Sequence, residues 1–579
     1  MKKIVSTLLA VSCLTSFVAC GTPVDNSGSG ANQAGADKTT IKVANYDGGI
    51  GSVWIQKAAE RFAELRKETS YAKGKKGVFV DVERAEAIVT TNISRESTDI
   101  YFMERYIDVQ NLAKQGLVYD VSSVFTDETR VGGKLENAVY DNALDALKLN
   151  GKYYGVPHYE FFGGVTYDRE AFDDNLAYFA AEDETDVIEY NGVCIESSCS
   201  FIGSLGAKKS KGSDGIEGTE DDGLPCSAEE YILLMDYFAN ETEYAPMVVS
   251  GRYLGYAAYF VSGMWASLAG YEQMCNYYNC TGEIEIVTGY TDEPIFPGID
   301  YIKKPTTQKV NLTEEDRNGY LGNTMAAKYY ALALLEIMER EGFFSNDSYV
   351  GTVDHYGAQK CLIYDGVASY KKVAMLMEGS YWYNEAKNGR VFEAYETLSQ
   401  NKEERDLRFM PLPTSLYTDG AVAKASCLLD IGQAYGIVNA NIAGDDETIG
   451  AVLDFLSFLY SEEELKYFTE ETGLGRAIDY SVDNMDGVST FYKDLWNLRD
   501  DGKNVVYYSG TTETFKKVKD AIRLDLNCLR LNLSSTSTFL AELRSNTTKL
   551  PSKEYKRGTK ALFEATQLSE TMWREYLGL

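Results

Sequence analysis

The segment from Ile41 to Leu65 constrains the fold of this chain most strongly, because it joins a strand pattern to a helix pattern. Residues 41 to 46 form a short β-type run, and a glycine-rich turn, "DGGIGS", follows it. The next apolar residues recur at the spacing of one helix face; they are Ile55, Ala58, Ala59, Phe62 and Leu65. Such a strand–turn–helix unit predicts an α/β fold.

Later segments repeat this alternation in both halves of the chain. Strand patterns occupy residues 78–82 and 99–102, and an extended segment surrounds Pro157. Further strand and helix patterns follow at 366–386 and 428–440. The helix pair at 447–472 has a capping box, Ser461 with Glu464, and a stop at Gly473.

The glycine turn does not indicate a nucleotide site. A dinucleotide fingerprint requires G-x-G-x-x-G and a P-loop requires Gly-Lys-Ser/Thr, whereas this turn reads G-G-x-G and continues with neither motif. Trp54 lies in the first turn of the predicted helix, at the carboxyl end of the preceding strand. Open α/β sheets place ligands at that end, so Trp54 either faces a ligand crevice or belongs to the core.

The N-terminus predicts export. Met1, Lys2 and Lys3 form a positive start, and residues 4–18 form an apolar run too short to span a bilayer. Residues 17–21, "FVACG", resemble a bacterial lipobox, with Phe17 where leucine is usual. We therefore expect a signal peptide over residues 1–19, a lipid on Cys20 and a flexible polar tether over 20–40. This predicts a protein anchored by its lipid to the outer face of the cell membrane.

Composition narrows the possible partners. The formal net charge of −31 disfavours binding to nucleic acid or to an anionic membrane surface. Hydrophobic residues make up 44% of the chain, enough for a large core and more than one domain. The 43 tyrosines combine a flat apolar face with a polar tip, which suits amphipathic ligands, although many tyrosines also serve as core.

The part of the chain after the predicted signal peptide has eight cysteines besides Cys20, which permit disulfides outside the cytosol. They are Cys194, Cys199, Cys226, Cys275, Cys280, Cys361, Cys427 and Cys528. Two pairs share the spacing C-x4-C, Cys194 with Cys199 and Cys275 with Cys280, and either pair could close a small local loop. Zinc is a weak alternative, because there is no C-x-x-C motif and only two histidines are present.

Five stretches, in order, carry a family resemblance. They are "DGGIGSVW" after the first strand, "TDIYFMERYIDVQNLAKQGLVYDVS" (98–122), "NGKYYGVPHYEFFGGVTYD", "AMLMEGSYWYNEA" and "LSFLYSEEELKYFTEETGLGRA". Behind a lipoprotein signal, this order resembles the extracellular solute-binding lipoproteins of ABC importers, in the sugar-binding branch that includes maltose-binding protein. The resemblance covers residues 41–170 and 366–480, whereas 182–350 looks like an insertion.

The resemblance implies a two-lobe periplasmic-binding-protein-like (type II) α/β fold, with each lobe a sheet flanked by helices and a ligand cleft at the hinge. Lobe one would comprise residues 41–160 and 433–480, and lobe two residues 161–432 and 481–579. A carbohydrate would be trapped as the lobes close, and a membrane permease would recognise the closed state. The family implies a monomer that needs no cofactor and catalyses no reaction.

Candidate ligand-binding residues follow from the matching stretches. They are Trp54, Glu104, Arg105, Tyr159, Glu160, Phe161, Tyr381 and Trp382, with Trp265 outside the matched region. Charged groups such as Glu104 and Arg105 bond sugar hydroxyls, but exposed pairs of this kind are often only solvated. The family's maltose-binding member has an acid at the position of Phe161, and Glu160 is the adjacent acid here. Tyr381 and Trp382 are either a stacking platform or core.

An acidic stretch in residues 212–223 suggests calcium. Asp214, Glu217, Asp221 and Asp222 lie within nine residues, around Gly215 and Gly218. Hard oxygen ligands on a bent loop suit a structural Ca²⁺, although the spacing is not that of an EF-hand and a plain acidic turn is equally compatible. The following helix begins with a second capping box, Ser227 with Glu230.

Three other classes of function remain open from the sequence. A glycoside hydrolase needs two carboxylates flanking one bond, for which Glu160 and Glu378 are candidates. A peptide-binding importer subunit would hold peptide main chain through polar groups. A surface adhesin that binds glycans is the third alternative.

Overall fold

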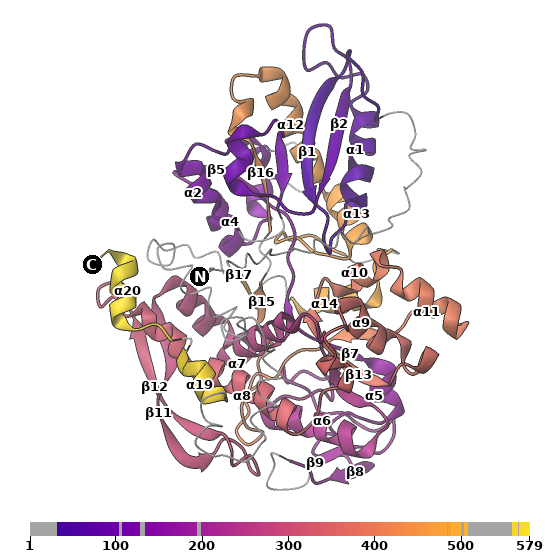
Figure 1. The fold of residues 1–579 in the computed structure, drawn as a ribbon, viewed down its shortest axis with the longest axis vertical. Coiled ribbons are helices and arrows are strands. Elements are labelled where there is room, and N and C mark those ends of the chain that lie inside the picture. The colour runs from indigo at the N-terminus through magenta and orange to yellow at the C-terminus, as the bar shows by residue number, and fades with distance from the viewer. Residues whose placement is uncertain are drawn as a thin grey trace, which may run out of the picture.

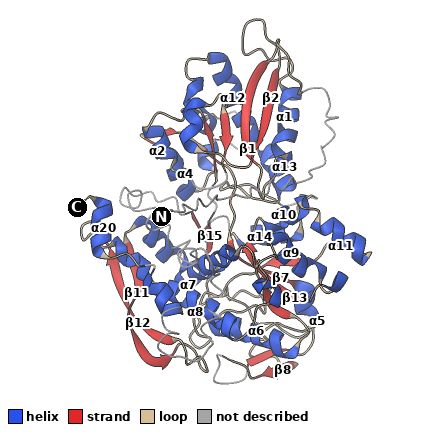
Figure 2. Cartoon of the chain, viewed as in Figure 1, coloured by secondary structure: helices blue, strands red, loops and turns tan. Residues whose placement is uncertain are grey.

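In the described part of the computed structural model, the two largest β-sheets are each flanked by helices and lie in an upper and a lower body in the view of Figure 1. The structure describes residues 32–103, 107–127, 134–193, 199–431, 434–482, 485, 487–499, 503–507, 558–565 and 567–578. Figure 2 shows helices packed around the strands of both bodies. The predicted α/β fold class is therefore confirmed.

The first sheet has five strands in the order β2-β1-β3-β16-β6. These strands are β1 (Thr39–Tyr46), β2 (Val78–Ala85), β3 (Ile100–Phe102), β6 (Val156–Pro157) and β16 (Tyr435–Val438). Strand β1 pairs in parallel with β2 and β3, while β16 runs antiparallel to β3 and β6. Helices α1 (Val53–Leu65) and α12 (Asp446–Leu459) pack against this sheet, and α13 (Glu462–Thr472) packs on both helices.

Local sequence signals account for the ends of these helices. The hydroxyl of Ser461 accepts a hydrogen bond from the Glu464 amide at the start of α13. Gly473 ends α13 with a φ of 64°, a left-handed conformation that glycine adopts without strain. The predicted capping box and glycine stop are therefore confirmed.

The second sheet has four strands in the order β10-β13-β7-β14. These strands are β7 (Gly163–Asp168), β10 (Ala245–Val248), β13 (Val373–Gly379) and β14 (Leu407–Phe409). Strand β13 is parallel to β10 and antiparallel to β7. The helices around it are α5 (Arg169–Asp174), α6 (Ala228–Glu241), α7 (Ala257–Asn279), α8 (Ala326–Arg340), α9 (His355–Tyr364), α10 (Trp382–Asn388), α11 (Val391–Ser399) and α14 (Thr490–Leu498).

The chain passes between the two bodies at several points. Residues 158–162 connect β6 to β7, and the segment after α13 leads to α14. Strand β15 (Leu428–Asp430) precedes β16 and pairs in parallel with β17 (Val505–Tyr507). The Phe161 amide donates to Oδ1 of Asp430 at 3.2 Å, so two of these connections are joined directly.

Residues 182–350 contribute to the second body itself. They supply β10, α6, α7 and α8, and their apolar side chains belong to its main core. Two hairpins from this region extend outward in Figure 1. These are β8 (Val187–Tyr190) with β9 (Cys199–Ile202), and β11 (Gly282–Pro294) with β12 (Lys303–Leu312). The region is therefore more than a surface insertion.

The remaining elements are short. They are α2 (Val109–Lys114), α3 (Ser122–Thr126), α4 (Asp141–Leu147), β4 (Lys148–Leu149), β5 (Lys152–Tyr153), α19 (Thr559–Ala565) and α20 (Glu570–Leu577). Helix α19 packs against α8, and the Thr559 hydroxyl donates to Glu336 at 2.6 Å. In the described part of the chain, every helix is too short or too polar to cross a bilayer.

One predicted disulfide is not formed. Cys275 and Cys280 are both free thiols. Cys275 lies within α7, whereas Cys280 caps the end of that helix in a left-handed conformation and is buried. The helical rise between the two positions separates them, so the C-x4-C spacing did not indicate a bond here. The other predicted pair includes Cys194, which lies outside the described residues.

Candidate functional site

The loops that leave the carboxyl ends of strands in the two sheets meet each other. The glycine turn at 47–52 follows β1, and helix α10 follows β13. Asn384 of α10 donates from Nδ2 to the carbonyl oxygens of Gly49, at 2.9 Å, and Ile50, at 3.2 Å. Because open α/β sheets bind ligands outside the carboxyl ends of their strands, this seam between the bodies is the candidate site.

The glycine turn is shaped for this contact. Gly49 and Gly51 have φ values of 61° and 74°, which side chains rarely adopt. A Cβ atom on Gly49 would lie 3.4 Å from the Tyr381 ring. The sequence indicates no nucleotide role for these glycines; their left-handed conformations form the turn that lies against Tyr381 of the other body.

An aromatic cluster lies at the seam, and we define it as Tyr159, Phe161, Tyr256, Tyr259 and Tyr381. The Phe161 ring meets the edge of Tyr381 at 5.0 Å between centroids and lies 6.1 Å from Tyr259. Tyr256 stacks on Tyr259 at 5.5 Å, and Tyr159 stacks near Phe161 at 6.2 Å. Phe161 and Tyr381 are only half-buried. The cluster therefore offers aromatic faces and phenol groups at the place where a ligand would lie.

The sequence analysis identified three of these five rings. It missed Tyr256 and Tyr259, which lie in the stretch "LGYAAYFVSG". They come from the beginning of α7, in the region that resembled an insertion. The Y-x-x-Y spacing was the available signal, but core tyrosines in helices share it.

Glu160 is held within the seam by fixed partners. Its Oε1 lies 2.9 Å from Nε of Arg499, and its Oε2 accepts a hydrogen bond from the Tyr507 hydroxyl at 2.7 Å. Burial raises the pKa of Glu160, and the nearby Arg499 guanidinium opposes that rise. A cavity of about 10 Å³ borders Glu160, Ser380 and Trp496. Glu160 is therefore tied to the segment after α14, and little space surrounds it in this conformation.

Glu160 and Glu378 belong to separate groups of partners. Glu378 accepts a hydrogen bond from Gln359. Among the described residues, Gln359 forms no hydrogen bond with Arg499 or Tyr507, the partners of Glu160. A glycosidase requires two carboxylates on either side of one bond. These contacts do not favour a hydrolytic pair.

Three predicted tryptophans lie in the core. Trp382 is fully buried, and its Nε1 donates to the Thr166 hydroxyl at 2.8 Å. Trp54 packs between Phe102 and Phe468, at 5.2 and 5.1 Å. Trp265 is buried in α7. The sequence left a core role open for Trp54 and Trp382, and both rings lie in the core. Trp265 lies in the core as well, so these three rings are not assigned to the ligand site.

Glu104 and Arg105 lie outside the described residues. They come two and three residues after Phe102, the last residue of β3. Their assignment to the ligand site therefore stays a prediction.

The acidic loop at 212–223 uses its carboxylates to bond its own backbone. Asp221 Oδ2 accepts from the Asp214 amide at 3.0 Å, and Asp222 Oδ2 accepts from the Gly218 amide at 2.7 Å. Asp214 Oδ1 accepts from the Ile216 amide at 2.7 Å, while Glu217 is exposed. Within the described ranges, no three potential metal ligands gather closely enough to hold an ion. This geometry favours the acidic-turn alternative, and calcium binding stays an untested prediction.

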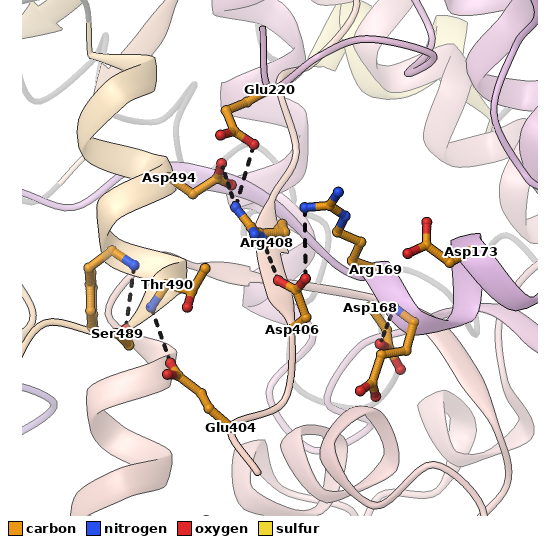
Figure 3. Close-up of polar contacts among 12 residues, drawn as sticks. Asp168, Arg169, Asp173, Glu220, Glu404, Asp406, Arg408, Ser489, Thr490 and Asp494 are labelled. Atoms are coloured by element: carbon orange, nitrogen blue, oxygen red, sulfur yellow. Dashed lines mark hydrogen bonds and ion pairs between the residues drawn. The ribbon is translucent and has the colours of Figure 1, made fainter. Parts of the chain in front are cut away.

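The same loop also joins an ion cluster with β14 and α14 (Figure 3). Arg408 of β14 lies between three carboxylates. Its guanidinium is 3.4 Å from Glu220 of the loop and 3.4 Å from Asp494 of α14, and it also pairs with Asp406. The cluster fixes α14, which follows the segment after α13, onto the second sheet.

Comparison with solved structures finds this fold in several bacterial proteins. A protein of Caldanaerobius polysaccharolyticus, described in a study of xylan utilisation, is 12% identical over 91% of this chain and 99% of its own, with a TM-score of 0.52. The GacH receptor of Streptomyces glaucescens is 13% identical over 93% and 99% of the two chains, with a TM-score of 0.51. RafE of Streptococcus pneumoniae gives 13% over 93% and 100%, with a TM-score of 0.50.

These matches span nearly the whole of both chains, so the type II two-lobe fold implied by the family resemblance is confirmed. No protein-family model matches the sequence, and no curated protein matches it either. At identities of 12–13%, structural similarity establishes the fold alone. The function must therefore be argued from the site.

Proposed function

We propose that this chain is an extracytoplasmic binding protein that captures an oligosaccharide between its two lobes and delivers it to the permease of an ABC transporter. The observation that carries this proposal is the aromatic cluster at the seam. This cluster lies where the carboxyl ends of strands from the two sheets meet. Aromatic faces stack on the apolar faces of sugar rings, and the phenol groups and neighbouring amides bond hydroxyls.

The fold supports the same conclusion. The GacH receptor is described in complex with acarbose, and a further protein with this fold is described as a chitin oligosaccharide binding protein. On this proposal, lobe one comprises residues 41–160 and 433–480, and lobe two residues 161–432 and 481–579. The several connections between them form the hinge about which the lobes close.

The proposal extends to the setting of the protein. Residues 1–19 would direct export, Cys20 would carry the lipid, and residues 20–40 would tether the folded lobes to the membrane. A single lipid chain binds a membrane only marginally, so the dual or triple acylation typical of lipoproteins would be needed for a stable anchor. The protein would act as a monomer and leave its ligand chemically unchanged.

A thermal-shift screen of the mature chain tests this proposal. A ligand that binds only the folded state raises the melting temperature by mass action. We expect at least one oligosaccharide to raise it, and chromatography of the mixture to return the sugar unchanged. Peptide hits without any saccharide hit would favour a peptide importer, and recovery of cleaved sugar would favour a hydrolase.

A further inference from the structure

Two glutamates lie beside the aromatic cluster, Glu378 buried and Glu385 partly exposed, and we call them the acid pair. Glu378 is the penultimate residue of β13, close to the carboxyl end of that strand, and only 1% of it is exposed. Glu385 lies in α10, the helix that meets the glycine turn. Both therefore come from elements that form the seam.

A single amide joins the acid pair. Nε2 of Gln359, from helix α9, donates to Glu378 Oε1 at 3.3 Å and to Glu385 Oε2 at 2.9 Å. These two bonds use both hydrogens of the amide. His355 Nε2 lies 3.7 Å from Glu385 Oε1, and His355 is partly exposed.

Two acceptors at this place have no donor. Within the described part of the chain, neither Glu378 Oε2 nor Gln359 Oε1 has a hydrogen-bond partner, and both residues are almost completely buried. Native proteins satisfy nearly all buried polar groups, because an unsatisfied one costs free energy. The arrangement therefore lacks a group that donates hydrogen bonds.

The acid pair adjoins the cluster. Glu378 lies three residues before Tyr381, and the Glu385 amide donates to the Tyr381 carbonyl oxygen at 3.2 Å. Burial raises the pKa of Tyr256, and the charges of Glu378 and Glu385 raise it further. The pKa of Tyr381 is raised by burial, by Tyr259 and Tyr256, and then by the same two carboxylates. A group placed among these tyrosines would therefore be close to the unpaired acceptors.

We propose that the acid pair and Gln359 receive a protonated amine of the captured ligand, so that the ligand is an oligosaccharide containing an amino sugar. This inference rests on the proposed function. An ammonium group supplies three donors and no acceptor, which matches the unpaired oxygens of Glu378 and Gln359. Burial raises the pKa of Glu378 and that of Glu385, and an ammonium charge beside them favours their ionised form. The tyrosine faces also attract cations. A hydroxyl group would supply one donor and no charge.

Matched sugars test this inference. Oligosaccharides in amine, N-acetylated and hydroxyl forms, otherwise identical and covering several linkages, would be screened by thermal shift and then by calorimetry at pH 6.5. We expect the amine form of the best ligand to bind at least tenfold more tightly than the other two forms. In Glu378→Gln, which keeps the shape of the side chain, we expect the amine form to lose at least tenfold in affinity.

One control and one further variant separate this effect from a structural one. Glu339→Gln changes another buried glutamate, in α8, whose carboxylate accepts a hydrogen bond from Tyr349. It should leave the preference for the amine form unchanged. Glu385→Gln provides a second variant of the acid pair, for use if Glu378→Gln does not fold.

The outcomes distinguish the two proposals. Equal binding of all three forms, or unchanged binding of the amine form in both acid-pair variants, would overturn the amino-sugar inference and leave carbohydrate capture intact. If no saccharide of any form bound the folded protein, both proposals would fail.

Discussion

Tyr381 and Trp382 are adjacent in the sequence but occupy different environments. Tyr381 precedes α10 and turns its ring toward Phe161 and the glycine turn. Trp382 begins the helix and enters the core beside Phe491, at 5.7 Å between centroids. The sequence left open whether these residues form a stacking platform or belong to the core, and a strand-to-helix junction gives no period from which to decide.

Substitutions at Trp382 should therefore affect stability. Trp382→Ala should lower the free energy of unfolding by about 3–5 kcal/mol through loss of buried contacts. Trp382→Phe keeps an aromatic ring and loses the bond to Thr166, so it should cost about 1 kcal/mol from that bond, plus a smaller packing loss. Urea denaturation measures both. A Trp382→Ala variant that unfolded like the wild type but lost ligand affinity would return this residue to the site.

Arg476 presents a second feature at the residue scale. Its guanidinium is fully buried and packs over the rings of Phe468, at 4.0 Å, Tyr460, at 4.4 Å, and Trp54, at 5.4 Å. Within the described residues, none of its side-chain nitrogens has a hydrogen-bond partner. Because burial keeps water away from the charged guanidinium, it lowers the pKa of Arg476. Cation–π contacts offset only part of the cost of burying the charge.

Replacing this charge with an apolar chain of similar length should be tolerated. We expect Arg476→Met to leave the free energy of unfolding unchanged or to raise it by about 1–2 kcal/mol. Arg476→Ala would leave a cavity and should lower it by about 2–4 kcal/mol. Denaturant titration of both variants provides the measurement. A large destabilisation by methionine would show that the guanidinium has a partner that the packing conceals.

At the scale of elements, the Arg408 cluster joins β14, α14 and the acidic loop (Figure 3). Burial and the nearby Glu220 raise the pKa of Asp494 to about 8, against the opposing effect of Arg408. The unfolded chain releases this proton near a pH of about 4. Between these values the folded state binds more protons than the unfolded state, so this group lowers stability as the pH rises.

The melting temperature should report this linkage. Between about pH 5 and pH 8, we expect the wild type to lose more stability than Asp494→Asn, because asparagine cannot titrate. Asp183→Asn, an exposed change in the same lobe, should follow the wild type. Parallel curves for wild type and Asp494→Asn would contradict the raised pKa.

The acidic loop allows a second test at this scale. Asp221 accepts hydrogen bonds from the Asp214 amide, at 3.0 Å, and the Thr219 hydroxyl, at 2.7 Å. Asp221→Ala should therefore lower the free energy of unfolding by about 1–3 kcal/mol. The loss should be the same with chelator and with excess calcium, measured by thermal melts. A calcium-dependent rise in the wild type that Asp221→Ala abolished would establish the metal site instead.

At the scale of the whole molecule, local patterns were predictable and long-range contacts were not. The strand at 41–46, the caps of α6 and α13 and the stop at Gly473 depend on neighbouring residues, and all are confirmed. The role of 182–350 depends on contacts between distant segments, such as α7 with β7 and β13. The pairing of Glu160 with Arg499 and Tyr507 spans more than 330 residues, and no local signal reveals it.

The ligand site was also predictable only in part from the sequence. Family resemblance located the seam through Tyr159, Phe161 and Tyr381, because these lie in matched stretches. It could not exclude Trp54 and Trp382, since an aromatic side chain fits a core and a sugar platform equally well. Gln359 and the acid pair come from three elements whose proximity only the fold creates.

The most direct test of the account is a calorimetric titration of the best oligosaccharide from the screen into wild type and Tyr381→Ala. We predict one binding site per wild-type chain and a loss of affinity of about thirtyfold in the variant, equivalent to about 2 kcal/mol. The melting temperature without ligand should stay near that of the wild type, because Tyr381 is only half-buried. Equal affinity for both proteins would contradict capture at this seam, as would the absence of saccharide binding to the folded wild type.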